Sequence, residues 1–197
     1  MALSLAGVVI LAGSMSLTDI VNAQALPFFL VQPLAFLVFL TADSAEMNRA
    51  PFDMVEAESE LTGGYHTEYS GVKWAIFTQA EFTAPLVSAA LATVLFLGGA
   101  KDLGPIPGQL MFLAKTSLVV FVLVWFRATW PRLRVDQIMG FAWKGLFPLA
   151  LLNMFLVAVE VSLFQNSAGE ISIDSLWKMA GINWAATAVS IVVIANV

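Results

Sequence analysis

The sequence contains no cysteine, a single histidine and few charged residues. Only 12% of its 197 residues are Asp, Glu, Lys or Arg, well below the roughly one quarter that is usual in soluble domains. The absence of cysteine excludes disulfides, thiolate metal sites and iron–sulfur clusters held by this chain. The chain also shows no phosphate-binding glycine motif, no nucleophilic triad and no metal-ligand spacing. It therefore predicts neither a metal site nor a catalytic residue of its own.

Apolar residues are correspondingly abundant. They make up 59% of the chain, and the mean hydropathy is +0.85. A soluble protein of this size could not hide so much apolar surface from water, so the composition predicts an integral membrane protein. The N-terminal stretch lacks the positively charged region of a signal peptide and is interpreted as a membrane helix. The net charge of −5 predicts no nucleic-acid partner.

The apolar residues fall into runs whose length predicts five to six membrane spans. We therefore expect an all-α fold, a polytopic transmembrane helix bundle that forms a single domain over residues 1–197, with one large ordered cytoplasmic loop. The expected spans are Ala2–Leu17, Pro27–Thr41, Val72–Leu97, Leu110–Phe126 and Phe141–Phe164, with a sixth at Trp177–Val197.

The polar stretch Thr41–Glu81 stands apart from these runs. It holds eight of the fourteen acidic residues but only two basic ones, Arg49 and Lys73. Its mixture of carboxylates, aromatics, proline and glycine favours an ordered loop at residues 43–72 over a floppy linker. Most lysine and arginine residues lie on the side of the membrane that carries this loop and the loop after the fourth run, which predicts that both loops face the cytoplasm.

Three of the ionisable residues inside the expected spans lie away from the start of their span, where a charge costs at least about 2.5 kcal/mol. Glu81 has polar surroundings and continues the acidic series, which favours a functional carboxylate that can hold or pass a proton near neutral pH. Lys115 is equally compatible with snorkelling to the interface and with function. Glu160 is expected to be an interfacial carboxylate.

The loop itself leaves alternatives open. Glu56, Glu58 and Glu60 alternate along the chain, and clustered carboxylates must be protonated, paired or hydrated. A solvated acidic turn explains them as well as a functional site does. Tyr65 and His66 are either packing residues or hydrogen-bond donors to a ligand.

Several stretches of the chain resemble one family. AEMNRAPFD (45–53), EAESEL (56–61) and GYHTEYSG (64–71), together with PRLRVDQIM (131–139) and WKGLFPLALLN (143–153), are similar to the H-subunit family of bacterial respiratory NADH:quinone oxidoreductase, complex I. Its mitochondrial counterpart is the NADH dehydrogenase subunit 1 family. The resemblance covers nearly the whole chain but only the C-terminal part of the family's subunit, because the first spans of the family have no counterpart here.

The resemblance implies a role in an enzyme whose redox centres lie elsewhere. Members help to form the quinone chamber of a proton-pumping translocase, with quinone as substrate and with FMN and iron–sulfur clusters in partner subunits only. Quinone-site iron–sulfur subunits, antiporter-like membrane subunits and the lipid bilayer of the bacterial inner membrane are the implied partners. The implied chamber and loop residues are Glu46, Arg49, Asp53, Tyr65 and His66, and those of a buried proton path are Glu56, Glu58, Glu60, Glu68 and Glu81.

Two other functions remain open. The membrane subunit of an energy-converting [NiFe] hydrogenase would use a similar helix scaffold, although the NRAPFD and GYHTEYSG stretches look like the quinone-linked branch. A structural membrane anchor for a redox arm would have no need of Glu81 inside the membrane. A stand-alone transporter is disfavoured because no inverted repeat is visible.

Overall fold

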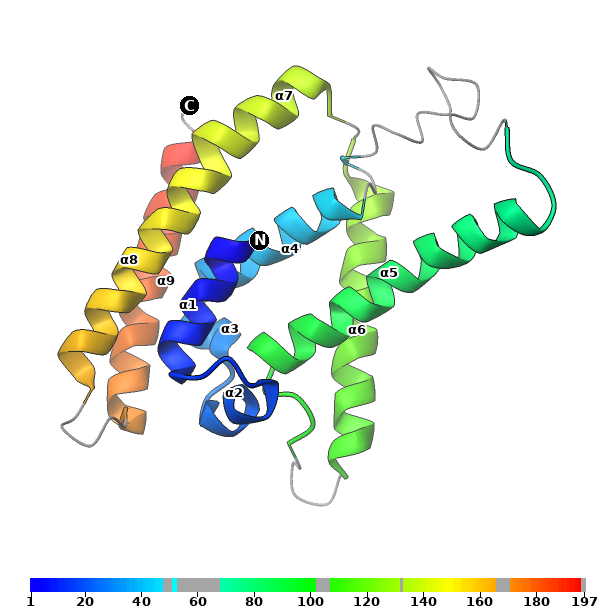
Figure 1. Ribbon diagram of the computed structural model, residues 1–197. Helices are drawn as coiled ribbons and strands as arrows, with labels where there is room; N and C mark the ends of the chain where they lie inside the picture. Colours follow the sequence, from blue (N-terminus) through cyan, green and yellow to red (C-terminus); the bar gives the residue numbers. More distant parts are fainter. Residues whose placement is uncertain (48–50, 53–67, 102–106, 132, 166–170, 196–197) are drawn as a thin grey trace.

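The computed structural model describes residues 1–47, 51–52, 68–101, 107–131, 133–165 and 171–195, of which residues 193–195 are described by their backbone alone. Helices account for most of these residues (Figure 1). The described part contains no strand, only one isolated bridge between Gln165 and Ile171. The structure thereby confirms the all-α, polytopic class that the composition predicts.

Three helices in the described part are long and apolar enough to cross a membrane. They are α5 (Val72–Phe96), α6 (Gly108–Thr129) and one continuous helix of 30 residues, Val135–Phe164. The last comprises α7 (Val135–Gly140), a π-helical segment (Phe141–Leu146) and α8 (Phe147–Phe164). Each coincides with an expected apolar run.

The first apolar run is not a straight helix. It forms α1 (Ala2–Ala12) and ends where α2 (Leu17–Ala23), which was not expected, begins. The two helices are bent by 62° relative to each other and together pass as a fourth, broken span. Gly13 ends α1 in the left-handed conformation with φ 67°, which glycine adopts without strain.

The second apolar run is also broken. It forms α3 (Phe28–Val31) and α4 (Pro33–Glu46), which meet at Gln32. Because Pro33 has no N–H to continue the first helix, the chain turns there. The 14 residues of α4 extend only about 21 Å, less than the roughly 30 Å of a bilayer core. That this run and α9 (Ile173–Ala195) each cross the membrane stays a prediction.

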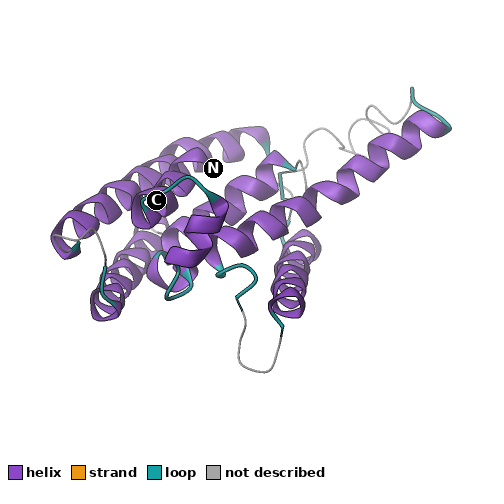
Figure 2. Ribbon diagram, turned by 60° about the horizontal axis from the view of Figure 1, so that its bottom comes forward, coloured by secondary structure: helices purple, strands orange, loops and turns teal. Residues whose placement is uncertain are grey.

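The helices assemble into a bundle with one projecting arm. α8 packs along α1 and α4, and α9 packs against α3, α4 and α8. The core of buried side chains includes Phe28, Phe39 and Phe96, and it joins α3 and α4 to the end of α5. The first half of α5 extends beyond the other helices in both views (Figures 1 and 2) and exposes large apolar side chains such as Trp74 and Ile76.

The end of α5 is secured by side chains from other elements. Gln24 is 2% exposed, and its Nε2 donates hydrogen bonds to the carbonyls of Val94 and Leu95 at 2.9 and 3.0 Å. Lys115 of α6 donates from Nζ to the carbonyls of Leu97 and Gly99 at 2.7 and 3.2 Å. These donors satisfy carbonyls that a helix end leaves without partners, and the ammonium complements the helix dipole.

The same junction extends into the α2–α3 connection. Lys101 Nζ donates to the carbonyls of Asn22 and Gln24. Burial in this loop, outside the membrane helices, lowers the pKa of Lys101. Neither of the two interpretations of Lys115, snorkelling or a function, is needed to explain its position, because its ammonium binds carbonyls at the end of α5.

The contacts at this junction predict that Lys115→Met lowers stability, because methionine keeps a long apolar side chain but lacks the ammonium. We expect a lower thermal midpoint of the purified complex, because losing charge-assisted bonds to two carbonyls costs on the order of 1–3 kcal/mol. Lys178→Met is the matched control, because Lys178 is an exposed lysine of α9. Equal midpoints for the two variants would contradict the structural role of Lys115.

Candidate functional site

Three of the predicted site residues lie in the described part of the chain. Glu46 is the last residue of α4 and is exposed, and Glu68 is exposed shortly before α5 begins. Glu81 lies in the first half of α5 and is half-buried. The remaining predicted residues fall outside the described ranges, and they are Arg49, Asp53, Glu56, Glu58, Glu60, Tyr65 and His66.

Pro51 and Phe52, two of the described residues of the polar loop, contact residues near the second group of family-like stretches, 131–153. The N–H of Leu133 donates a hydrogen bond to the carbonyl of Pro51 at 3.1 Å. Phe52 is 6% exposed, and its ring stacks on Phe141 with centroids 6.5 Å apart. Pro51 and Phe52, far from residues 133 and 141 in the sequence, therefore lie beside the start of the long α7–α8 helix.

Glu81 belongs to the less exposed face of α5. Thr78, Pro85 and Ser88 share that face, because they lie three, four and seven residues from Glu81. Exposure falls along the face, from a half-buried Glu81 to a buried Ser88. Pro85 removes one hydrogen bond from the helix ladder between them.

A second carboxylate contacts this face of α5 at the point where α5 enters the helix bundle. Asp43 of α4 is 4% exposed, and Ser88 Oγ donates a hydrogen bond to Asp43 Oδ2. Ser88 lies about 10 Å along the helix axis from Glu81. The sequence pattern alone places Asp43 in the loop and gives it no role. Its position directly after an apolar run, within one helical turn of Thr41, is the signal that could have found it.

Glu160 is not the interfacial carboxylate that we expected. It is 4% exposed, and its Oε2 accepts a hydrogen bond of 2.8 Å from Asn183 Nδ2 of α9. The expectation was wrong because α9 covers this face of α8, as Figure 1 shows. Thr187 and Ser190 continue the buried polar face of α9.

Two amides are buried near the break between α3 and α4. Gln32 is 0% exposed and donates from Nε2 to the carbonyl of Gly7 at 3.2 Å, and Asn153 of α8 is 1% exposed. A Cβ on Gly7 would lie 3.0 Å from Gln32 Oε1 and 3.2 Å from Asn153 Nδ2. Glycine at this position of α1 therefore makes room for both amides.

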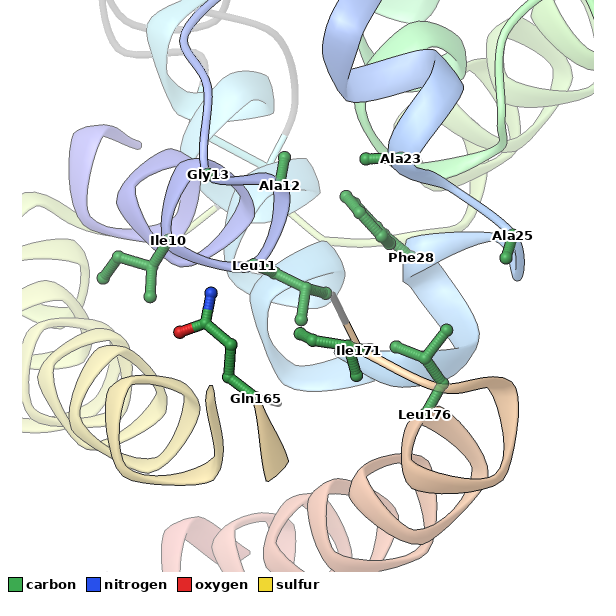
Figure 3. A pocket seen from close by; sticks show the side chains of 10 residues that line it. All are labelled: Ile10, Leu11, Ala12, Gly13, Ala23, Ala25, Phe28, Gln165, Ile171 and Leu176. Atoms are coloured by element: carbon green, nitrogen blue, oxygen red, sulfur yellow. The ribbon is translucent and has the colours of Figure 1, made fainter. Parts of the chain in front are cut away.

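A cavity of about 280 Å³ lies at the end of α1 and α8 (Figure 3). Leu11, Phe28 and Ile171 line it with apolar side chains, and the amide of Gln165 turns towards Ile10 and Leu11. The cavity lies at the opposite end of the bundle from the end of α4. It is therefore separate from the front of the acidic loop.

A model of the NADH dehydrogenase family matches residues 1–158. The chain belongs to this family. It is 55% identical over 168 residues to the H subunit of NADH-quinone oxidoreductase from Geobacillus thermodenitrificans (strain NG80-2), with 83% of this chain and 51% of the relative covered.

Two further relatives carry the same name. The Geobacillus kaustophilus (strain HTA426) protein is 56% identical and the Bacillus cereus (strain B4264) protein is 53% identical. Each alignment covers 83% of this chain and 50% of the relative. The chain thus spans about half the length of the curated relatives it matches.

The described residues of this NADH dehydrogenase family chain offer hydrogen bonding and proton exchange. No group of three or more His, Asp or Glu in the described part is placed to hold a metal ion. The buried acids are instead Asp43 beside a hydroxyl and Glu160 beside an amide. Each of these carboxyl groups lies beside a neutral side chain that can hydrogen-bond with it.

Proposed function

We propose that the chain is part of the membrane subunit of a proton-pumping NADH:quinone oxidoreductase. In this role it helps to form the quinone chamber and couples quinone reduction to proton translocation. The names of relatives more than 50% identical support this function over a hydrogenase membrane subunit. Electrons reach quinone from FMN and iron–sulfur clusters in partner subunits.

The observation that carries the proposal is the contact between the two family-like motifs. Pro51 and Phe52 contact Leu133 and Phe141, which fixes these two residues of the polar stretch against the start of the α7–α8 helix. We propose that the loop lines the chamber from the cytoplasmic side, with Glu46 at its start and Arg49, Asp53, Tyr65 and His66 beyond it. Other complex I subunits cover this loop and the exposed arm of α5.

In this proposal, a row of carboxylates forms the proton path. Glu56, Glu58, Glu60 and Glu68 are proposed to lead to Glu81, and the face of α5 continues from there to Ser88 and Asp43. Interacting carboxylates titrate collectively, so a charge change at the quinone end alters proton occupancy further along the row. Coupling therefore needs no redox centre in this chain.

Deleting the gene of the full-length subunit tests this function. Membranes without it should lose NADH:quinone reductase activity, while the soluble arm keeps transferring electrons from NADH to a water-soluble artificial acceptor. The full-length gene should restore quinone reduction, and so should a Ser162→Ala version, because Ser162 is exposed on α8. Quinone reduction that persists without the subunit, in a strain with no second NADH:quinone reductase, would refute the proposal.

A further inference from the structure

Three residues on or against one face of α8 bury polar atoms that lack hydrogen-bond partners within the described part of the chain. These atoms are Gln32 Oε1, both amide atoms of Asn153, and Glu160 Oε1. Asn153 and Glu160 are seven residues apart on α8 and share its inner face. Gln32 reaches the same region from the break between α3 and α4.

Such atoms are costly in an apolar interior. Polar groups withdrawn from water almost always find a hydrogen-bond partner, which is protein or an ordered water molecule. No lysine or arginine forms an ion pair with Glu160 among the described residues, and its one bond to Asn183 occupies a single oxygen. The second oxygen therefore calls for a partner that is small enough to enter a packed bundle.

The two amides approach the same point beside Gly7. Gly7 of α1 faces them without a side chain, and a Cβ added there would crowd both Gln32 Oε1 and Asn153 Nδ2. A bridging water donates to amide oxygens and accepts from an amide N–H. It would thus satisfy Gln32 Oε1 and Asn153 together.

A cavity that can hold water lies beyond Glu160, at one end of the bundle. Gln165, five residues beyond Glu160, turns its amide into the cavity at the ends of α1 and α8 (Figure 3). That cavity of about 280 Å³ has room for several water molecules, since each occupies about 30 Å³ in the liquid. Its described lining includes polar groups as well as apolar side chains.

We propose that the inner face of α8 is an internal hydration site, with water bound between Gln32 and Asn153 and at Glu160, through which Glu160 exchanges its proton. In the exchange the carboxylic O–H of Glu160 passes its proton to the adjacent water, and that water returns another to the carboxylate. Glu160 is then a further protonatable acid of the membrane part, separate from the acidic loop, Glu81 and Asp43.

Infrared spectroscopy of the intact complex tests the exchange. A carboxylic C=O band should shift in D₂O and disappear in Glu160→Gln, while it persists in Glu81→Gln. Asn153→Leu should slow the deuterium shift by about tenfold or more, because it removes both amide contacts to water. Ser162→Ala, on the exposed face of the same helix, should exchange as the wild type does. A band unaffected by Glu160→Gln, or a wild-type rate in Asn153→Leu, would overturn the proposal.

A density map of the unmodified complex at a resolution that shows water gives a second test, which holds even if Asn153→Leu does not assemble. Water density is expected within hydrogen-bond distance of Glu160 Oε1 and between Gln32 and Asn153. A side chain or a metal cation in those positions, or direct contact that satisfies these atoms, would refute it. Neither test measures quinone turnover, so its failure and that of the proposed function are distinguishable.

Discussion

A Glu81→Gln variant is expected to assemble into the complex but to reduce quinone at least about tenfold more slowly, a barrier increase of about 1.4 kcal/mol. Glutamine keeps the shape and most of the hydrogen bonding of glutamate but cannot release a proton. Glu81 occupies the half-buried face of α5 that continues to Ser88, where Asp43 is bound. A neutral amide at this position interrupts the proposed row of carboxylates.

Two controls sharpen this experiment. Glu81→Asp keeps an exchangeable proton and should retain more turnover than Glu81→Gln. Gln79→Ala removes an exposed polar side chain from the same helix and should behave as the wild type does. NADH:quinone reductase assays on purified complexes with equal subunit content make the comparison. Wild-type turnover in Glu81→Gln would leave a structural anchor as the better account of this chain.

Gly99→Ala is expected to be the most damaging small substitution at the junction that ends α5. Gly99 has φ +56°, and an added Cβ would lie 2.8 Å from Val21 Cγ2. The left-handed backbone costs a non-glycine residue about 1–2 kcal/mol, and overpacking adds about 1–3 kcal/mol. We therefore expect a loss of about 2–5 kcal/mol, visible as a lower thermal midpoint of the purified complex.

A variant of the neighbouring glycine, Gly98→Ala, separates the backbone cost from the cost of overpacking. Gly98 has φ +79°, but its added Cβ would meet nothing closer than Gln24 Oε1 at 3.7 Å. Gly98→Ala should therefore show the backbone cost alone. Val21→Ala, combined with Gly99→Ala, should relieve the clash and leave a stability close to that of a Gly98→Ala, Val21→Ala double variant. Equal midpoints for Gly98→Ala and Gly99→Ala would show that the Val21 contact does not determine the packing.

The apolar runs are sufficient to predict the helices because a bilayer requires long, uninterrupted apolar segments. Local chemistry also marks the breaks, since Gly13 and Pro33 are residues that end or begin helices. The prolines of the second run predict a helix start and a kink, whereas the structure breaks the run at Gln32 and Pro33. How far a chain bends at such a point depends on what packs around it.

The buried polar residues are harder to predict because their environment comes from distant segments. Glu160 looks interfacial until α9 covers it, and Lys115 looks like a membrane charge until the end of α5 supplies carbonyls for it. Asp43 belongs to the polar stretch and resembles the rest of it, although Ser88 of α5 binds it inside the bundle. A hydropathy pattern describes a segment alone and carries no information about these partners.

Proton translocation in liposomes tests the central claim most directly. Purified wild-type complex oxidising NADH with quinone should acidify the lumen, and an uncoupler should abolish the signal. The account predicts that Glu81→Gln complex, compared at equal NADH oxidation rates, pumps fewer protons per NADH or none. Lumen acidification by Glu81→Gln at the wild-type rate and yield would contradict the role of this chain in coupling.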